Sequence, residues 1–186
     1  MSKKLAIFDL DGTLFDTREV NYLSYKHALA NQGFDLDYNF YTEQCNGKYY
    51  KEYLPLIIPN ITEEMMEDIH HDKKNAYFNN LGVSKVNEHL FNIISNLKTD
   101  YHIALVTTAS KTNCMDILNY FSKTNEFELI ITHNDVEKVK PDPEGFFKAM
   151  SYYNMSAENT IIFEDSEIGI EAAIRTGATV FTITKF

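Results

Sequence analysis

Carboxylates that follow two apolar runs are the residues of this sequence best suited to chemistry. Asp9 and Asp11 come directly after the run that ends at Phe8, and Glu164 and Asp165 close another run. Carboxylates beside a buried strand are costly unless a cation or hydrogen-bond donors satisfy them. Four of them near one point would demand a hard divalent cation, and an all-oxygen site suits Mg²⁺. We therefore predict a Mg²⁺ site at these strand ends.

One lysine and two threonines could offset negative charge at such a site. Lys140 lies in the segment VKPDP, whose two prolines stiffen the backbone around it. Thr107 and Thr108 end a further apolar run, and hydroxyls and N–H groups before a helix can cradle a substrate phosphate. Taken alone, the first segment could be an ordinary surface loop and the second a plain helix cap.

Five short apolar runs supply the strands that would position these side chains. They read as continuous apolar stretches, which is typical of parallel strands buried on both faces. Helical segments separate the last four, so we predict an α/β fold, a doubly wound five-stranded parallel sheet in the order 3-2-1-4-5. The runs are Leu5–Leu10, Ile103–Thr108, Leu129–Thr132, Thr160–Glu164 and Thr179–Thr184.

Apolar spacing predicts the helices between the strands. One has Val86, Leu90, Ile94 and Leu97 on its apolar face, and another follows Ser166, which can cap it. Further helices would carry Cys114, Ile117, Leu118 and Phe121, and Phe146, Phe147, Met150 and Tyr153.

The long gap between the first two strands predicts a second domain. A structureless loop from Asp16 to Gly82 would be very unusual, and helical patterns occur at Tyr22–Asn31, at Lys48–Ile57 and after the capping residue Thr62. We predict a core domain of residues 1–15 and 83–186, with a helical cap domain of residues 16–82 inserted after the first strand.

The order of these segments resembles the four motifs of the haloacid dehalogenase (HAD) superfamily. FDLDGT, a threonine after the second strand, the lysine of KPDP and the pair in EDS occur in that order and span nearly the whole chain. The closest resemblance is to the phosphoglycolate phosphatase and β-phosphoglucomutase-like subfamily, which implies a Rossmann-like core with a helical cap. The sequence departs at Val83–Asn87, where many relatives have a Pro-Gly pair.

The resemblance implies a role for each motif residue. Asp9 would be the nucleophile that forms an aspartyl-phosphate, and Asp11 the general acid and then the general base. Thr107 and Lys140 would hold the transferred phosphoryl group. Thr13 would orient the loop that carries Asp9.

The same resemblance implies the ligands of the metal and a contact to the substrate. Asp9, the backbone carbonyl of Asp11, and Asp165 would bind Mg²⁺, with Glu164 either a ligand or a neighbour that orients one. Lys48 lies where the family places the specificity loop of its cap, so it could bind an anionic group, although an ordinary surface lysine fits equally well.

These features predict an Mg²⁺-dependent phosphatase that acts on a small phosphorylated metabolite. Asp11 argues against a dehalogenase, because those relatives lack the second aspartate of the first motif. A sugar phosphomutase of the β-phosphoglucomutase type is the alternative, but those enzymes have a histidine where Asn21 stands here. A catalytically silent binding module is a second alternative, which the four clustered carboxylates disfavour. The substrate itself stays open.

Composition narrows the partners and the location. With 17 Lys and Arg against 27 Asp and Glu, the net charge of −10 disfavours nucleic acid and anionic membranes. We expect a cytoplasmic monomer, whose Cys45 and Cys114 are buried thiols.

We interpret the pair His70-His71 as a solvated helix face rather than a metal site. The tyrosines at positions 49, 50 and 53 are interpreted as packing within the cap.

Overall fold

The structure is a computed structural model that describes residues 3–185. The chain forms two compact units. The first, which we call the α/β unit, runs up to Asp16 and resumes at Lys85, and the second, the helical unit, is Thr17–Ser84. No helix within residues 3–185 has both the length and the apolar character that a bilayer crossing requires.

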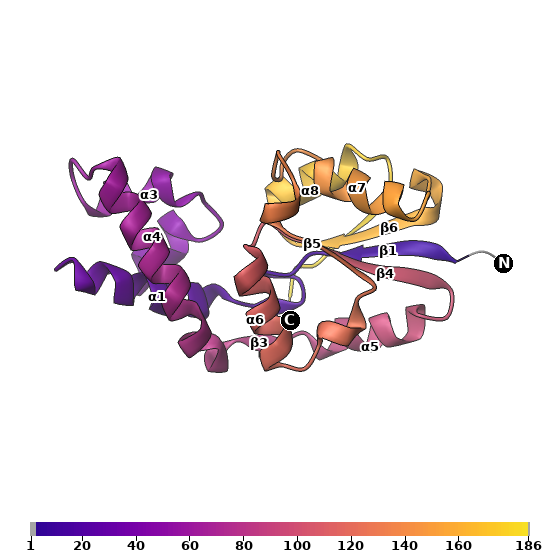
Figure 1. Ribbon diagram of the computed structural model, residues 1–186, viewed down its shortest axis with the longest axis horizontal. Coiled ribbons are helices and arrows are strands. Elements are labelled where there is room, and N and C mark those ends of the chain that lie inside the picture. Colours follow the sequence, from indigo (N-terminus) through magenta and orange to yellow (C-terminus); the bar gives the residue numbers. More distant parts are fainter. Residues whose placement is uncertain (1–2, 186) are drawn as a thin grey trace. The chain divides into compact units, whose positions relative to one another are not determined.

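A five-stranded parallel sheet forms the centre of the α/β unit (Figure 1). Its order is β5-β4-β1-β6-β7, which is 3-2-1-4-5 in chain order and confirms the predicted topology. Since all the pairings are parallel, the carboxyl ends of β1, β4 and β6 meet at one edge of the sheet. The strands are β1 (Lys4–Phe8), β4 (Tyr101–Val106), β5 (Leu129–Ile131), β6 (Thr160–Glu164) and β7 (Thr179–Thr182).

Helices cover both faces of this sheet. In Figure 1, α7 and α8 lie on one face, and α5 and α6 on the other. Phe146 of α7 and Ala172 of α8 belong to the same buried cluster as Leu5 and Ile7 of β1. The helices are α5 (Glu88–Leu97), α6 (Lys111–Tyr120), α7 (Glu144–Tyr152) and α8 (Glu167–Ile174), with 3-10 turns at Thr124–Glu126, His133–Asp135 and Ala157–Asn159.

Stacked phenylalanines join three strands near the carboxyl edge. Phe8, Phe163 and Phe181 are in register on β1, β6 and β7. The ring centroids of Phe8 and Phe163 are 4.5 Å apart, and those of Phe163 and Phe181 are 5.0 Å apart. This apolar row fixes the strand ends just before the acidic residues begin.

Two expectations about the α/β unit are wrong. The fifth run is not buried on both faces: β7 ends the sheet order, and Thr179, Phe181 and Thr182 are exposed. Val86 does not begin a helix. It lies in β3 (Lys85–Val86), which pairs antiparallel with β2 (Phe15–Asp16), and α5 begins only after Asn87, whose side chain accepts from the N–H of Leu90.

The helical unit has its own apolar core, to which Leu29, Leu54 and Ile69 contribute. The Thr62 hydroxyl accepts from the N–H of Met65, as its predicted role as a helix cap requires. The π-helical turn Tyr41–Cys45 was not predicted from the sequence. The elements are α1 (Arg18–Asn31), α2 (Tyr38–Phe40), the π turn, α3 (Tyr50–Ile57), α4 (Glu63–Tyr77) and the 3-10 segment Phe78–Val83.

His71 is exposed, as a solvated helix face requires, whereas His70 is only half-exposed. The His70 ring stacks on Tyr50 with centroids 4.0 Å apart, and its Nδ1 lies 2.8 Å from the Tyr25 hydroxyl. Tyr50 and Tyr53 are buried packing residues, but Tyr49 is 56% exposed. Helical spacing put His70 on α4 correctly, but it could not show that two tyrosines from other helices close over that position.

Candidate active site

Asp9 occupies the carboxyl end of the central strand. Its N–H still donates to the carbonyl of Phe163 at 3.0 Å, so β1 and β6 stay in register up to this carboxylate. The residue is only 6% exposed. The chain then turns at Gly12, which has φ +89° and donates its N–H to the Phe15 carbonyl at 2.7 Å.

Gly12 also makes room for Asp165. A Cβ atom at position 12 would lie 2.0 Å from Asp165 Oδ2, so any side chain there would displace this carboxylate. On its other oxygen, Asp165 accepts a 2.8 Å hydrogen bond from the Thr13 hydroxyl. The turn that follows β1 therefore packs closely against the end of β6, through the small size of Gly12 and the hydrogen bond of Thr13.

Glu164 is fully buried, and both of its carboxylate oxygens have partners. Oε1 accepts from Lys140 Nζ at 2.7 Å, while Oε2 accepts from the N–H and the hydroxyl of Ser166 at 2.8 and 3.1 Å. A Cβ atom on Gly169 would lie 1.9 Å from Oε1. The first turn of α8 therefore forms a close-fitting support for this one carboxylate.

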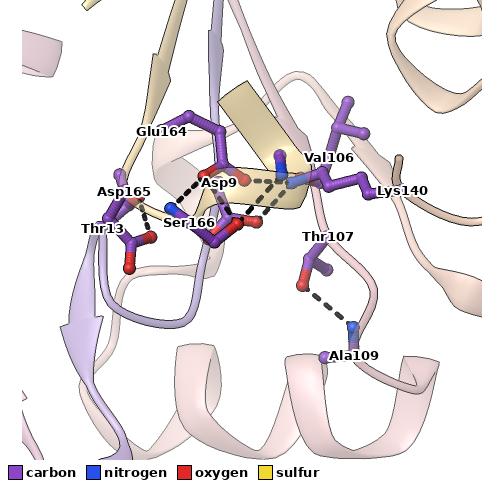
Figure 2. A network of polar contacts seen from close by, with 10 residues as sticks. Asp9, Thr13, Val106, Thr107, Ala109, Lys140, Glu164, Asp165 and Ser166 are labelled. Atoms are coloured by element: carbon purple, nitrogen blue, oxygen red, sulfur yellow. Dashed lines mark hydrogen bonds and ion pairs between the residues drawn. The ribbon is translucent and has the colours of Figure 1, made fainter. Parts of the chain in front are cut away.

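Lys140 joins the two acidic strand ends (Figure 2). Its ammonium donates to Asp9 Oδ1 at 2.5 Å, to Glu164 Oε1 at 2.7 Å and to the Val106 carbonyl at 3.0 Å. Three acceptors match the three protons of an ammonium, so the charge is buried but fully hydrogen-bonded.

Burial and charge shift the pKa values of this cluster. Burial raises the pKa of Asp9 well above its usual range, and the nearby Glu164 and Asp165 add to the rise while Lys140 opposes it. Burial likewise raises the pKa of Asp165 to about 6, against the Thr13 hydrogen bond and with help from Glu164 and Asp11. Burial alone would lower the pKa of Lys140, but the attraction of Asp9 and Glu164 outweighs it and raises the pKa.

The acidic cluster fits a divalent cation. Asp9, Glu164 and Asp165 each offer a carboxylate oxygen, and these atoms all lie within 4.8 Å of one another. When all three carboxylates are ionised, their negative charge exceeds the positive charge of Lys140 by two, which a metal such as Mg²⁺ or Ca²⁺ would balance. The donors are all oxygens, the ligands that hard cations take in proteins.

The remaining predicted residues lie at different places. Asp11 is half-buried beside the turn at Gly12. Thr107 is buried, and its hydroxyl accepts from the N–H of Ala109 at 3.0 Å. Figure 2 shows this hydroxyl directed towards Ala109 and away from Asp9. Thr108 is exposed, but with Thr107 and Lys140 it lines a cavity of about 10 Å³. Lys48 is exposed on the helical unit.

Three parts of this site were missed from the sequence. The Val106 carbonyl is a backbone group and leaves no sequence signal. Ser166 was recognised as a helix cap, and it does accept from the N–H of Gly169, but its bonds to Glu164 were not foreseen. Gly169 was given no role in the sequence analysis, although a glycine soon after an acidic strand end could have suggested close packing against a carboxylate.

Comparison with known proteins identifies related chains. The sequence model of the family described as haloacid dehalogenase-like hydrolase matches residues 6–183. A phosphorylated carbohydrates phosphatase of Thermotoga maritima is 26% identical, covering 92% of this chain and 80% of the relative. The β-phosphoglucomutase of Bacillus subtilis is 29% identical over 91% of this chain and 78% of its own.

The fold has counterparts among solved structures. A crystal structure of a predicted phosphoglycolate phosphatase from Haemophilus somnus superposes with a TM-score of 0.86. The two chains are 22% identical, and the match covers 97% of this chain and 84% of the other. At that identity, the likeness concerns the fold alone.

Proposed function

Because this chain belongs to the haloacid dehalogenase-like hydrolase family and is a phosphoric monoester hydrolase of that family, we propose that it hydrolyses a small phosphorylated metabolite through an aspartyl-phosphate on Asp9. The observation that carries this proposal is the position of Asp9. This buried carboxylate lies at the end of the central strand, bonded to Lys140, with two more carboxylates within 4.8 Å.

The first chemical step would be attack of an Asp9 oxygen on the phosphorus of the ester. The bond from phosphorus to the leaving oxygen breaks as Asp11 gives that oxygen a proton, which releases an alcohol. The Lys140 ammonium offsets charge on the transferred group, with hydrogen-bond donors of the Thr107–Thr108 segment.

The second step would release phosphate. Asp11, now ionised, takes a proton from water, and the water oxygen attacks the phosphorus of the aspartyl-phosphate. The bond to Asp9 breaks, which restores its carboxylate and frees inorganic phosphate. Both steps use the same pair of aspartates, so the enzyme returns to its starting protonation state.

Mg²⁺ is the cation that we propose for the acidic cluster. Asp9, Asp165 and the backbone carbonyl of Asp11 would hold it, with Glu164 as a further ligand or as a group that orients the others. When bound, the metal would neutralise the charge of the phosphate and of the carboxylates together. Asp9 could then approach a phosphate dianion despite the neighbouring carboxylates.

We propose that the helical unit serves as the cap predicted for residues 16–82 and selects the substrate. Lys48 remains the proposed contact to an anionic group on the substrate. The cytoplasm is the proposed location, because Cys45 and Cys114 are free, buried thiols that a reducing compartment would preserve.

The test is turnover combined with trapping of the intermediate. Purified protein should hydrolyse members of a panel of sugar phosphates, phosphoglycolate and nucleotides when Mg²⁺ is added, and a chelator should abolish that turnover. Rapid quenching followed by peptide mass analysis should place a phosphoryl group on Asp9. Full turnover after exhaustive chelation would contradict the metal site, and a phosphoryl group on another residue would contradict the mechanism.

A phosphomutase is the second candidate, favoured by the 29% identity to the B. subtilis β-phosphoglucomutase. Asn21 stands where the resemblance places a histidine in such mutases, and its amide donates at 3.1 Å to the carbonyl of Thr17, the residue just before α1. Product analysis separates the two activities. A phosphatase releases one inorganic phosphate per ester consumed, whereas a mutase converts one sugar phosphate into its isomer.

A further inference from the structure

The backbone that carries Lys140 is neither helix nor strand. The 3-10 turn before it ends at Asp135 and α7 begins at Glu144, so residues 136–143 form a loop. Nevertheless, the ammonium reaches two carboxylates and a carbonyl on strands β1, β6 and β4. Some contact other than regular secondary structure must therefore fix the loop.

Glu144 closes this loop with both of its carboxylate oxygens. Oε1 accepts from the N–H of Glu137 at 3.0 Å, and Oε2 accepts from the N–H of Lys138 at 2.8 Å. The two donors are consecutive residues at the start of the loop, and Glu144 is the first residue after it. Lys140 therefore lies inside a segment whose two ends are tied together by one side chain.

The carboxylate of Glu144 is itself held in place by α7. Lys148, one turn further along the helix, lies 2.7 Å from Oε1. Lys148 first, and then the two backbone N–H groups, lower the pKa of Glu144 to about 2, so its carboxylate is ionised at neutral pH. The same helix places the Phe146 ring 5.1 Å from the Lys140 ammonium.

The end of the loop has separate supports. Asp142 accepts from the N–H of Glu144 at 3.0 Å, and its own N–H donates to the Val139 carbonyl at 3.0 Å. Arg175, just after α8, donates to the Pro141 carbonyl at 2.9 Å. Lys148 of α7 also donates to the Asp135 carbonyl at 2.7 Å, just before the loop, but Glu144 is the side chain that bonds to backbone N–H groups within the first residues of the loop.

We infer that Glu144 is a positioning residue, which holds the loop so that the Lys140 ammonium lies between Asp9 and Glu164. This inference rests on the proposed function for its catalytic consequence. A displacement of about 1 Å in an active site can cost about 10²-fold in rate. Loss of the two hydrogen bonds from the loop N–H groups to Glu144 should therefore lower kcat by about 10- to 100-fold, although Glu144 touches none of the reacting groups.

A simpler explanation is that Glu144 only stabilises α7. An acidic residue in the first turn of a helix interacts favourably with the helix dipole whatever else it contacts. Glu144→Asp separates the two explanations, because it keeps the charge in the first turn but is one methylene too short to reach both N–H groups. Under the simpler explanation this variant should behave like the wild type.

The experiment compares Glu144→Asp and Glu144→Gln with the matched control Glu137→Gln. The control removes one negative charge from the same loop, at a residue whose backbone N–H, and not its side chain, bonds to Glu144. We expect kcat for a phosphate ester to fall about 10- to 100-fold in both Glu144 variants and to change less than about twofold in the control. Equal kcat in all four proteins would overturn the inference.

A second readout needs no turnover. The Lys140 ammonium has three hydrogen-bonded protons, so its N–H signal should be visible by NMR, and Lys140→Arg identifies it. The signal should persist in Glu137→Gln and broaden or vanish in Glu144→Asp. A signal unchanged in both Glu144 variants would overturn the inference even if kcat fell. A wild type that turns over no ester would contradict the proposed function alone, because the NMR comparison would still decide the role of Glu144.

Discussion

Both units bury polar side chains, but they stabilise them in different ways. In the α/β unit, the Lys140 ammonium faces Asp9 and Glu164 at the ends of two strands. In the helical unit, the buried polar groups lie among aromatic rings. The Tyr25 hydroxyl meets the His70 imidazole, and the Lys73 ammonium lies 5.4 Å from the centre of the Tyr25 ring.

This difference indicates which buried polar cluster has a chemical role. A shifted pKa does not distinguish the two, since burial raises the pKa of Tyr25 and of Tyr53 as well as that of Asp9. The polar cluster of the α/β unit, which we call the α/β cluster, consists of Asp9, Lys140, Glu164 and Asp165. It has more carboxylates than cations, so negative charge is left for a ligand to balance. The cluster of Tyr25, His70 and Lys73 has no excess of carboxylates over cations in its described contacts. Its polar groups therefore serve the packing of the helices.

The largest expected effect comes from Asp9→Asn. An amide cannot attack phosphorus, so turnover should fall by more than about 10⁴-fold and no phosphoenzyme should form. Steady-state hydrolysis measures the loss, and intact-mass analysis excludes deamidation back to Asp. Normal turnover by the intact amide would remove the reason to treat the α/β cluster as the reactive one.

Asp11→Asn should separate the two chemical steps. With a sugar phosphate, the leaving alkoxide needs a proton from Asp11, so the first step should slow by about 10²–10⁴-fold. With a nitrophenyl phosphate, that proton matters less. The phosphoenzyme should then accumulate, because no base activates water. Rapid-quench mass analysis measures it, and equal slowing of both substrates with no phosphoenzyme would contradict this role.

Gly12 and Gly33 provide a matched pair of substitutions across the two units. Their φ angles are +89° and +83°, but a Cβ at position 12 would meet Asp165, whereas one at position 33 has nothing within 4 Å. Both Ala variants should lose about 1–2 kcal/mol of unfolding free energy from the left-handed backbone. Only Gly12→Ala should also lose turnover, by about 10²-fold or more, because it displaces a carboxylate.

Denaturant unfolding and steady-state kinetics measure the two parts of this prediction. A Gly12→Ala protein with unchanged turnover would show that Asp165 tolerates displacement. In that case the close fit at Gly12 would be a matter of packing and not of chemistry.

The smallest effect is expected in the helical unit. Tyr25→Phe removes the hydroxyl that meets His70 and should cost about 0.5–1.5 kcal/mol of stability, with turnover retained. A loss of about 1 kcal/mol would lower the Tm by about 2–4 °C. Tyr152→Phe is the control, because it deletes a hydroxyl from a residue that is 68% exposed. Equal Tm values for both variants would show that the buried contact does not contribute.

The sheet could be predicted from the sequence because its strands carry strong local signals. Leu5–Phe8 and Ile103–Val106 are continuous apolar runs, and the right-handed crossover rule leaves few ways to order them. The signals fail at the boundaries between elements. Val86 fits a helical stripe, but its pairing with Phe15 depends on a residue far away in the sequence.

The candidate site could be predicted as a set of residues but not as a geometry. Asp9, Glu164, Asp165 and Lys140 were all identified, and the structure brings them together. Glu144 was not singled out, because a glutamate in the first turn of a helix is common in any sequence. Its importance depends on which two N–H groups it reaches, and residue types do not encode that contact.

The interrupted course of the α/β unit has a consequence during translation. Leu5 emerges from the ribosome early, but it pairs with His102 on one side and with Thr160 on the other. At about 5–20 residues per second, this apolar strand waits about 5–30 s until its two neighbours have been synthesised, and the uninterrupted helical unit is synthesised during that interval. Asp9 meets Asp165 only when β6 has been synthesised. A nascent chain that stalls before that strand therefore contains the proposed nucleophile but lacks the two carboxylates that complete the acidic cluster.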